Sequence, residues 1–407
     1  MKIQFCAYGG GHVTAVLPVI KMMLDRGHDC EFLALTTAGG VAETAGVYHQ
    51  RPIDYVDIDD PVIAHWGTKL AQLHHTEGKG ISLQESIAYL GVSFKDLASD
   101  MGEASAWKRY QLQGLNAFCP VYFMRTVLRK EKPDVVVATT SPRMEKAILR
   151  AAYQLRIPSL CMVELFGLME ETWLSRPDNG HVMAVSRSEV ANRMAAEGRQ
   201  AKDIFLTGSP MFDQLSRQDG RELRVLWQKK HDVPVNKKVV FWAEQPEPLD
   251  PELPRKVRNH LADVCRKNGW LLAIRLHPSS TDESKETVPY GCIQSSADES
   301  LLEVIHSSDV VVTLTSTVGW EGLLSDKPLL VFNISPNSHA VTYGDDDGAL
   351  ALDSLEDAEK GLSILLSENE ESLALQGLRR CLPKPGGATK RVCDLIEEKV
   401  FARKLTS

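Results

Sequence analysis

Several features are scarce in this 407-residue sequence, and each absence excludes a class of protein. No apolar run approaches the roughly 18 residues that a membrane-spanning helix needs. The first residues enter a strand pattern at once, so we expect no signal peptide. Positive charge is not in excess, because 46 Lys and Arg stand against 54 Asp and Glu, a net charge of -8. Such a chain is a poor candidate for binding nucleic acid.

The cysteines show no spacing that is typical of disulfide bonds or of a metal site. The eight cysteines include no CxxC pair and stand mostly among apolar residues, so we expect reduced thiols in the cytoplasm and neither disulfides nor a zinc site. Hydrophobic residues make up 43% and charged residues 25%, as in ordinary globular proteins. The length predicts two or three domains.

Short apolar strands alternate with amphipathic helices in two successive stretches, which predicts two doubly wound parallel sheets of the α/β class. The first stretch has expected strands at 2–8, 29–35, 133–140, 157–164, 181–186 and 203–208. The second has expected strands at 237–244, 270–277, 309–316 and 328–334, with helices at 252–268, 299–307 and 317–325. Region 57–120 lacks a strand pattern and is expected to form helices and loops that cap the first domain.

The turn residues of 208–236 indicate a domain boundary, so we expect an N-terminal domain over 1–207 and a C-terminal domain over 208–385. Residues 388–404 have the pattern of an amphipathic helix. This helix could cap its own domain or pack back on the first, and we assign 386–407 to the second arrangement.

The segment GGGHV (9–13) joins the first expected strand to the first helix. Glycines let a ligand approach the backbone, and a helix N-terminus favours an anion, so Gly10 and Gly11 are candidate binding residues for a phosphorylated ligand. His12 stands at the mouth of this turn. It is a candidate catalytic base or substrate hydrogen-bond partner, or alternatively a residue that caps the turn.

Two strand ends of the second domain carry further candidates. In RLHPSS (275–280), Pro278 ends the strand and leaves His277 at the carboxyl edge of the sheet, with Arg275 on the same face. His277 is a candidate donor to a phosphate or nucleotide, or else an incidental surface residue.

In TSTVGWEGLL (315–324), Ser316 and Thr317 precede a helix and form a candidate anion cradle. Gly319 allows close approach, and Glu321 is placed to accept from a ribose hydroxyl. The alternative is an ordinary Ser/Thr cap with a surface glutamate.

Other acidic and turn residues give weaker signals. Glu164 ends an expected strand and is a second candidate base. TGSPMFD (207–213) favours a structural turn in which Asp213 caps or clamps, and the alternative is a hinge near the ligand. The acidic stretches 57–60 and 344–348 are interpreted as solvated loops, so we expect no metal.

In this order, GGGHV, TGSPMFD, the His-Pro dipeptide and STVGWEGLL resemble the motifs of GT-B glycosyltransferases. The first loop resembles that of the N-acetylglucosaminyltransferase of peptidoglycan synthesis. The later motifs resemble bacterial capsule and lipopolysaccharide enzymes, including Kdo and sialic-acid-type transferases. The resemblance covers nearly the whole chain and implies two Rossmann-like domains facing across a cleft. It also implies that His277, Ser316 and Thr317 contact the phosphate of a nucleotide-sugar, that Glu321 reaches its ribose, and that His12 lies near the acceptor.

The resulting hypothesis is a metal-independent glycosyltransferase that uses a CMP- or UDP-linked sugar and a hydroxyl of a bacterial glycan or glycoconjugate. The acceptor could be a glycan, a lipid-linked molecule or a protein, with at most peripheral membrane contact. Two alternatives stay open: a non-hydrolysing nucleotide-sugar 2-epimerase, and a non-catalytic nucleotide-sugar-binding protein.

Overall fold

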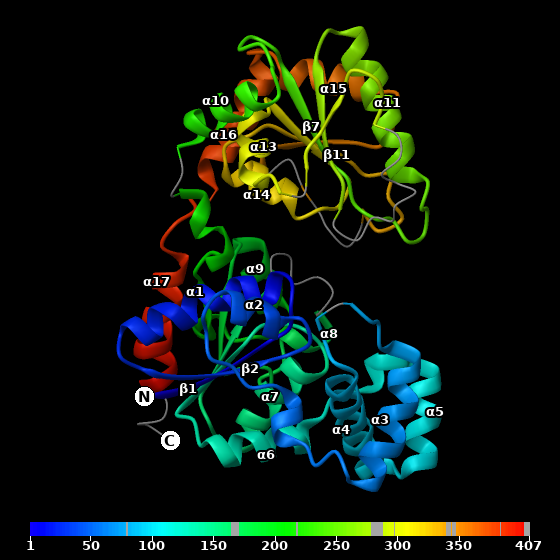
Figure 1. Ribbon diagram of the computed structural model, residues 1–407. Helices are drawn as coiled ribbons and strands as arrows, with labels where there is room; N and C mark the ends of the chain where they lie inside the picture. The colour runs from blue at the N-terminus through cyan, green and yellow to red at the C-terminus, as the bar shows by residue number, and fades with distance from the viewer. Residues whose placement is uncertain are drawn as a thin grey trace. The chain divides into compact units, whose positions relative to one another are not determined.

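The structure is a computed structural model that describes residues 1–78, 80–163, 171–216, 219–277, 288–296, 298–338, 343, 347–382 and 384–402, without the side chains of 171, 172 and 381. The chain divides into two compact units, Met1–Asp213 with Gly387–Ser407, and Gln214–Gly386. Within the described ranges, each unit is built on one sheet of six parallel strands (Figure 1). The prediction of two doubly wound α/β sheets is confirmed. The boundaries expected after 207 and 385 lie close to the divisions after 213 and 386.

The sheet of the first unit has the strand order β2-β1-β3-β4-β5-β6. Its strands are β1 (Lys2–Ala7), β2 (Asp29–Ala34), β3 (Val135–Ala138), β4 (Ser159–Met162), β5 (Val182–Val185) and β6 (Ile204–Leu206).

These strands are almost wholly apolar because helices cover both faces of the sheet. Ile3 and Phe5 pack into a core with α1, whereas Cys6 and Tyr8 point into a second core on the other face. The alternation of side chains along β1 therefore divides one continuous apolar run between two cores.

The described helices of the first unit are α1 (Gly11–Asp25), α2 (Ala38–Thr44), α3 (Pro61–His74), α4 (Leu83–Met101), α5 (Glu103–Gln113), α6 (Val121–Glu131), α7 (Met144–Gln154), α8 (Glu171–Leu174) and α9 (Ser188–Ala196). Three of them, α3, α4 and α5, lie in 57–120, the region expected to be helical. Short 3-10 turns lie at Pro52–Tyr55, Gly114–Ala117, Ala201–Asp203 and Pro210–Ser216.

Helices α3 and α4 cross at two glycines. A Cβ on Gly67 would collide with the carbonyl oxygen of Ile87, and a Cβ on Gly91 would lie 2.5 Å from the carbonyl oxygen of Ile63. At each glycine, the backbone of the other helix therefore comes closer than a residue with a side chain would allow.

The C-terminal helix packs on the first unit. Helix α17 (Ala388–Leu395) and the π turn Ile396–Val400 contribute Val392 and Ile396 to the core that contains α1. At its N-terminus, the Asp213 carboxylate accepts the backbone N–H groups of Ala388 (2.9 Å) and Thr389 (2.8 Å). Asp213 is therefore the cap of this helix, and the chain leaves the first unit beside the point where it returns.

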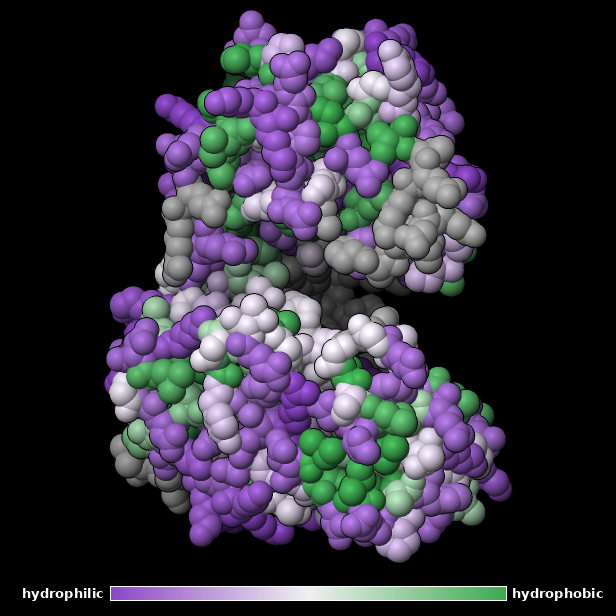
Figure 2. Space-filling view, viewed as in Figure 1, coloured by the Kyte–Doolittle hydropathy of each residue, from purple (hydrophilic) through white to green (hydrophobic). Residues whose placement is uncertain are grey.

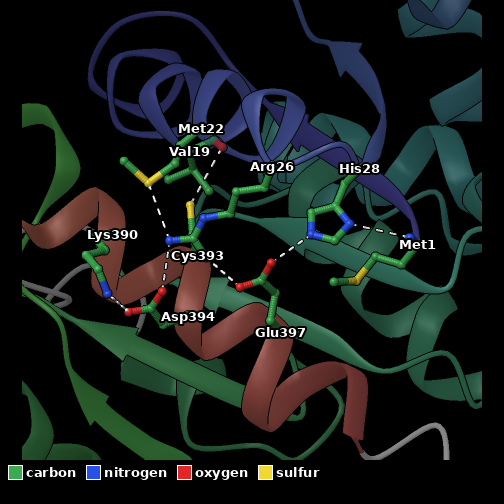
Figure 3. A network of polar contacts seen from close by, with 9 residues as sticks. All are labelled: Met1, Val19, Met22, Arg26, His28, Lys390, Cys393, Asp394 and Glu397. Carbon is green, nitrogen blue, oxygen red and sulfur yellow. Dashed lines mark hydrogen bonds and ion pairs between the residues drawn. The ribbon is translucent and has the colours of Figure 1, made fainter.

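Charged side chains also join α17 to the end of α1 (Figure 3). One guanidinium, that of Arg26, donates to Asp394 over 2.8 Å and to Glu397 over 2.5 Å. Glu397 also lies 2.7 Å from Nε2 of His28. The helix is thus held by apolar packing, a cap and ion pairs.

The sheet of the second unit has the order β12-β11-β10-β7-β8-β9. Its strands are β7 (Val239–Ala243), β8 (Leu271–Arg275), β9 (Ile293–Gln294), β10 (Val310–Thr313), β11 (Leu329–Phe332) and β12 (Ala349–Leu352). Its helices are α10 (Gly220–Lys230), α11 (Leu253–Lys267), α13 (Leu301–Ser307), α14 (Val318–Leu324), α15 (Ala358–Leu365) and α16 (Glu370–Cys381).

In the part of the chain that the structure describes, no helix is both long and apolar enough to cross a bilayer. On the face shown in Figure 2, hydrophilic residues cover most of both units and hydrophobic ones form separate patches.

Candidate functional site

In open parallel sheets, ligands bind beyond the carboxyl ends of the strands, where the strand order reverses. In the first unit this reversal lies between β1 and β3, because β2 and β3 flank β1 on opposite sides. Tyr8 follows β1 and Thr139 follows β3, so both stand at the reversal. His12, in the first turn of α1, lies beside them, with its ring centroid 6.4 Å from that of Tyr8.

A chain of hydrogen bonds links His12 to a buried carboxylate. Nδ1 of His12 lies 2.6 Å from Oγ1 of Thr139, and the Thr139 hydroxyl donates to Oε2 of Glu145 over 2.5 Å. Because that hydroxyl gives its proton to Glu145, its oxygen accepts from Nδ1–H of His12. The neutral imidazole then carries its basic lone pair on Nε2. We call these three residues the His12 relay.

Glu145 lies at the buried end of the relay, with none of its surface exposed. It also accepts the backbone N–H groups of Tyr8 (2.7 Å) and Ser141 (2.8 Å). Burial raises the pKa of Glu145, while His12, the Thr139 hydroxyl and the two N–H groups favour its charged form. Nδ1 of His12 lies 3.6 Å from Oε2 of Glu145, close enough to stabilise an imidazolium. The relay thus joins the His12 imidazole to a buried carboxylate that orients it.

The glycine turn before α1 leaves the helix N-terminus open. Gly10 has a φ of 70° and is the N-cap residue of α1. A side chain on Gly9 would collide with Thr37, while Gly10 and Gly11 are exposed. His12 does not cap this turn through Nδ1, which is used by Thr139. Binding of a phosphorylated ligand by Gly10 and Gly11 stays a prediction.

In the second unit the strand order reverses between β7 and β10, because β8 and β11 lie on their outer sides. Gln245 follows β7 and Thr315 follows β10. Their side chains and backbone form two hydrogen bonds, from Nε2 of Gln245 to Oγ1 of Thr315 (2.5 Å) and from N–H of Thr315 to Oε1 of Gln245 (3.0 Å). This pair fixes the two strand ends together at the reversal.

The turn after β10 is ordered by its own residues. Oγ of Ser316 accepts the N–H of Val318 over 3.2 Å, whereas Thr317, the N-cap residue of α14, makes no cap bond and is exposed. The Tyr343 hydroxyl donates to the carbonyl of Ser316 over 2.5 Å. A Cβ on Gly319 would lie 2.9 Å from that hydroxyl, so Gly319 is required for the packing of Tyr343. Contact of Ser316 and Thr317 with phosphate stays a prediction.

Glu321 carries an unusual carboxylate on α14. The residue is half-buried, and its carboxylate makes no hydrogen bond or ion pair with any residue that the structure describes. Burial raises the pKa of Glu321 to about 7. A partly shielded carboxylate without a partner has unused capacity to accept two hydroxyl hydrogen bonds, as the vicinal hydroxyls of a ribose would supply.

The strand end after β8 carries two candidate residues, Arg275 and His277, which have different surroundings. Nη1 of Arg275 donates to Oγ of Ser295 (3.1 Å) and to the carbonyls of Ser296 (3.2 Å) and Glu299 (2.7 Å). This group therefore fastens the segment that follows β9. His277 has an exposed side chain, and partial shielding lowers its pKa.

Two predicted site residues, Glu164 and Pro278, lie outside the described residues. The acidic stretch 57–60 is described, and there Asp60 caps α3 and pairs with Lys95 over 2.5 Å. Across the described ranges, no group of three His, Cys, Asp or Glu side chains is arranged to hold a metal ion.

Sequence reasoning missed Thr139 and Glu145. A signal for Thr139 was available, because TTS (139–141) follows an apolar strand as TSTVG (315–319) does in the second unit. Glu145 has no such signal, since a glutamate in the first turn of an amphipathic helix is ordinarily exposed.

No family model matches this chain. Teichoic acid glycerol-phosphate primase of Bacillus spizizenii is 22% identical over 372 residues, which cover 76% of this chain and 91% of the primase.

Two solved structures show the fold. UDP-GlcNAc 2-epimerase of Neisseria meningitidis, bound to UDP-GlcNAc, superposes with a TM-score of 0.62 at 13% identity, over 98% of this chain and 100% of the epimerase. MurG of Acinetobacter baumannii superposes with a TM-score of 0.58 at 13% identity, over 98% of this chain and 99% of MurG. The protein therefore has the GT-B fold of two Rossmann-like domains, which glycosyltransferases and nucleotide-sugar epimerases share.

Proposed function

We propose that this protein is a glycosyltransferase that moves a sugar from a UDP- or CMP-linked donor to a hydroxyl of a bacterial glycan or glycoconjugate. The observation that supports the proposal is the His12 relay, in which Thr139 and Glu145 orient an imidazole at the strand reversal of the first unit. The Glu321 carboxylate at the corresponding place in the second unit supports a nucleotide site there.

In this mechanism, Nε2 of His12 takes the proton of the acceptor hydroxyl while its oxygen bonds to the anomeric carbon. The bond from that carbon to the phosphate oxygen breaks, and its electron pair leaves with the nucleotide. A base of this kind contributes roughly 10²–10⁴-fold to the rate. Glu145 stabilises the imidazolium through Thr139. Glu164 remains the alternative base.

The second unit supplies the nucleotide contacts. Glu321 accepts from the ribose hydroxyls, and Ser316, Thr317 and His277 donate to the phosphate on which negative charge develops. Preorganised donors of this type stabilise a leaving group without a metal, and the loss of one costs about 10²–10³ in rate. We assign the enzyme to the cytoplasm, in keeping with the seven cysteines whose side chains are described, none of which forms a disulfide with another.

Two other reactions have specific support. The likeness to a glycerol-phosphate primase favours transfer of a nucleotide-activated glycerol phosphate, and the likeness to UDP-GlcNAc 2-epimerases favours epimerisation. An epimerase releases an isomer of its substrate without any acceptor. A transferase instead releases a nucleotide only when acceptor is present, apart from slow hydrolysis.

The test is a thermal-shift screen of UDP, CMP, CDP and GDP, followed by NMR of the matching nucleotide-sugars with and without candidate acceptors. A ligand that binds the native state raises the melting temperature. We expect one nucleotide to do so and Glu321→Gln to reduce the shift, while His12→Ala keeps the shift and loses turnover. Absence of any shift with all four nucleotides would overturn the proposal.

A further inference from the structure

The first unit contains a pocket whose lining includes none of the three residues of the His12 relay. Its empty volume is about 650 Å³, part of it open to solvent. Its walls come from the end of β2, from α3 and α4, and from the turn before α7, which contribute Thr36, His74, Tyr89 and Arg143. We call it the Arg143 pocket.

Backbone strain is concentrated at this pocket. Of the six non-glycine residues with positive φ in the part of the chain that is described, four lie at the C-terminal ends of helices, where a left-handed residue is a common cap. The other two, Thr36 (φ 52°) and Arg143 (φ 70°), stand before helices instead, and both line the pocket. Strained residues of this kind persist where the surrounding structure holds them, and they cluster at ligand sites.

Arg143 is the uncompensated charge of the lining. The other arginine, Arg51, pairs with Glu43 over 2.6 Å and with Glu85. The Arg143 side chain makes no hydrogen bond or ion pair with any described residue, and its buried Nε–H has no partner. Its guanidinium lies 5.2 Å from the ring centroid of Tyr8. Burial and the charge of Arg143 lower the pKa of His74, which keeps that ring neutral at pH 7.

The pocket adjoins the His12 relay through Tyr8. The Tyr8 hydroxyl lies 2.6 Å from that of Tyr89, a wall of the pocket, and accepts the N–H of Met144 over 3.3 Å. Tyr8 also contacts the ring of His12 edge-on. Arg143 of the pocket and His12 of the relay therefore contact the same aromatic ring, that of Tyr8.

We propose that the Arg143 pocket binds the acceptor through an anionic group, a phosphate or a carboxylate, that pairs with the guanidinium of Arg143. The inference rests on the proposed transferase function and names the acceptor class: a sugar or polyol that carries this anion beside its reacting hydroxyl. Thr36 and Ser86 offer hydroxyls to the polar body of such a ligand, and Leu90 and Leu115 supply an apolar wall. The planar fork of an arginine suits either anion.

The experiment measures binding of glucose 1-phosphate, glucuronate, inorganic phosphate and glucose to the full-length protein by NMR or calorimetry. We expect the three anions to bind and glucose to bind at least about tenfold more weakly, because a hydrogen bond to a charged group is worth about one to two powers of ten. Farnesyl phosphate serves as a second arm. If it binds more tightly than glucose 1-phosphate, the anion belongs to a lipid carrier, and the reverse order indicates a soluble acceptor; both results support the proposal.

Arg143→Gln should weaken binding of every anion by about tenfold or more, and Arg143→Lys, which keeps the charge but not the fork, by less. The matched control is Arg129→Gln, which removes an exposed arginine on α6 and should change nothing. Equal anion affinity in wild type and Arg143→Gln, or no anion binding to wild type, would overturn the inference. Nucleotide binding is measured on the same samples, so failure of the proposed function is visible separately as loss of the nucleotide signal in the wild type.

Discussion

His12 and Thr139 are 127 residues apart in the sequence, yet Nδ1 of the first lies 2.6 Å from Oγ1 of the second. The two residues meet because β1 and β3 are neighbours, with Cys6 opposite Ala138 near their carboxyl ends. The contact determines the tautomer of His12 and hence which nitrogen is basic. It converts a histidine on an exposed turn into an oriented group.

Removing the central hydroxyl of the His12 relay should slow the reaction without affecting nucleotide binding. Thr139→Val has nearly the same shape but removes the hydroxyl that links Nδ1–H of His12 to the Glu145 carboxylate, which keeps its two backbone N–H donors. We expect kcat to fall by about ten- to a hundredfold, since a lost hydrogen bond to a charged group costs about 1.5–3 kcal/mol. Steady-state kinetics and calorimetry with the nucleotide provide the measurement. Thr139→Ser keeps the hydroxyl and should retain most of the activity; wild-type kcat in Thr139→Val would contradict the role of the relay.

Glu321 should make stability depend on pH. Its pKa is about 7 in the folded protein against 4.5 ordinarily, so between these values the folded state binds more protons than the unfolded state. The free energy of unfolding therefore falls as pH rises from about 4.5 to 7, at up to about 1.4 kcal/mol per pH unit from this group.

The variant Glu321→Gln has no titrating carboxylate at this position, so its free energy of unfolding lacks this fall with rising pH. We expect it to match the wild type near pH 4.5 and to be more stable at pH 8 by up to about 3 kcal/mol, measured by urea unfolding at both values. Glu368→Gln, which changes an exposed glutamate of the same unit, is the control and should show no such difference. Equal stability of Glu321→Gln and wild type at pH 8 would show that this carboxylate is not shielded.

The crossing of α3 and α4 should not accept even one methyl group at Gly91. Because its Cβ would lie 2.5 Å from the backbone oxygen of Ile63, we expect Gly91→Ala to cost about 1–3 kcal/mol of stability. The matched control is Gly40→Ala in α2, where a Cβ meets open space and should add about 0.4–1 kcal/mol. Thermal unfolding compares the two variants, and a Gly91→Ala protein as stable as Gly40→Ala would contradict the close approach.

The cap of α17 by Asp213 should contribute measurably to the stability of the first unit. Asp213→Ala leaves the N–H groups of Ala388 and Thr389 without their acceptor, at an expected cost of about 1–3 kcal/mol. Asp213→Asn keeps one acceptor oxygen and should cost less. If urea unfolding gives the same midpoint for Asp213→Ala and wild type, the cap is energetically unimportant.

Metal removal should leave transfer intact. We expect turnover in excess EDTA to stay within about twofold of the untreated enzyme, because the proposed leaving-group stabilisation uses protein hydrogen-bond donors. Restoration of lost activity by Mg²⁺ would instead show that a metal takes part.

The sequence predicted the sheets well because buried parallel strands are continuous apolar runs, as in Val135–Ala138 and Val310–Thr313. It missed β9 (Ile293–Gln294) and β12 (Ala349–Leu352), since short edge strands carry too few apolar residues to form a pattern. Helix α17 ends in a π turn at Ile396–Val400 within the single helix expected from the four-residue spacing.

The candidate site was only partly readable from sequence. Local patterns place His12 and Ser316 at strand ends, because glycine and hydroxyl residues mark such turns. The partner of His12 comes from a strand more than a hundred residues away, and only the strand order brings it near. Arg275, predicted on the same face as His277 and as a nucleotide-binding residue, donates through Nη1 to the segment after β9, a contact that no local pattern encodes.

The Asp213 cap makes the second unit an insertion that can be exchanged as one segment, in the laboratory or in evolution. Residues 214–386 are inserted between two points of the first unit that one carboxylate ties together. Such a segment can be exchanged as a single cassette, since a new insert needs only ends that are close together. Replacing it with a few glycines and serines should likewise yield the first unit as a stand-alone protein.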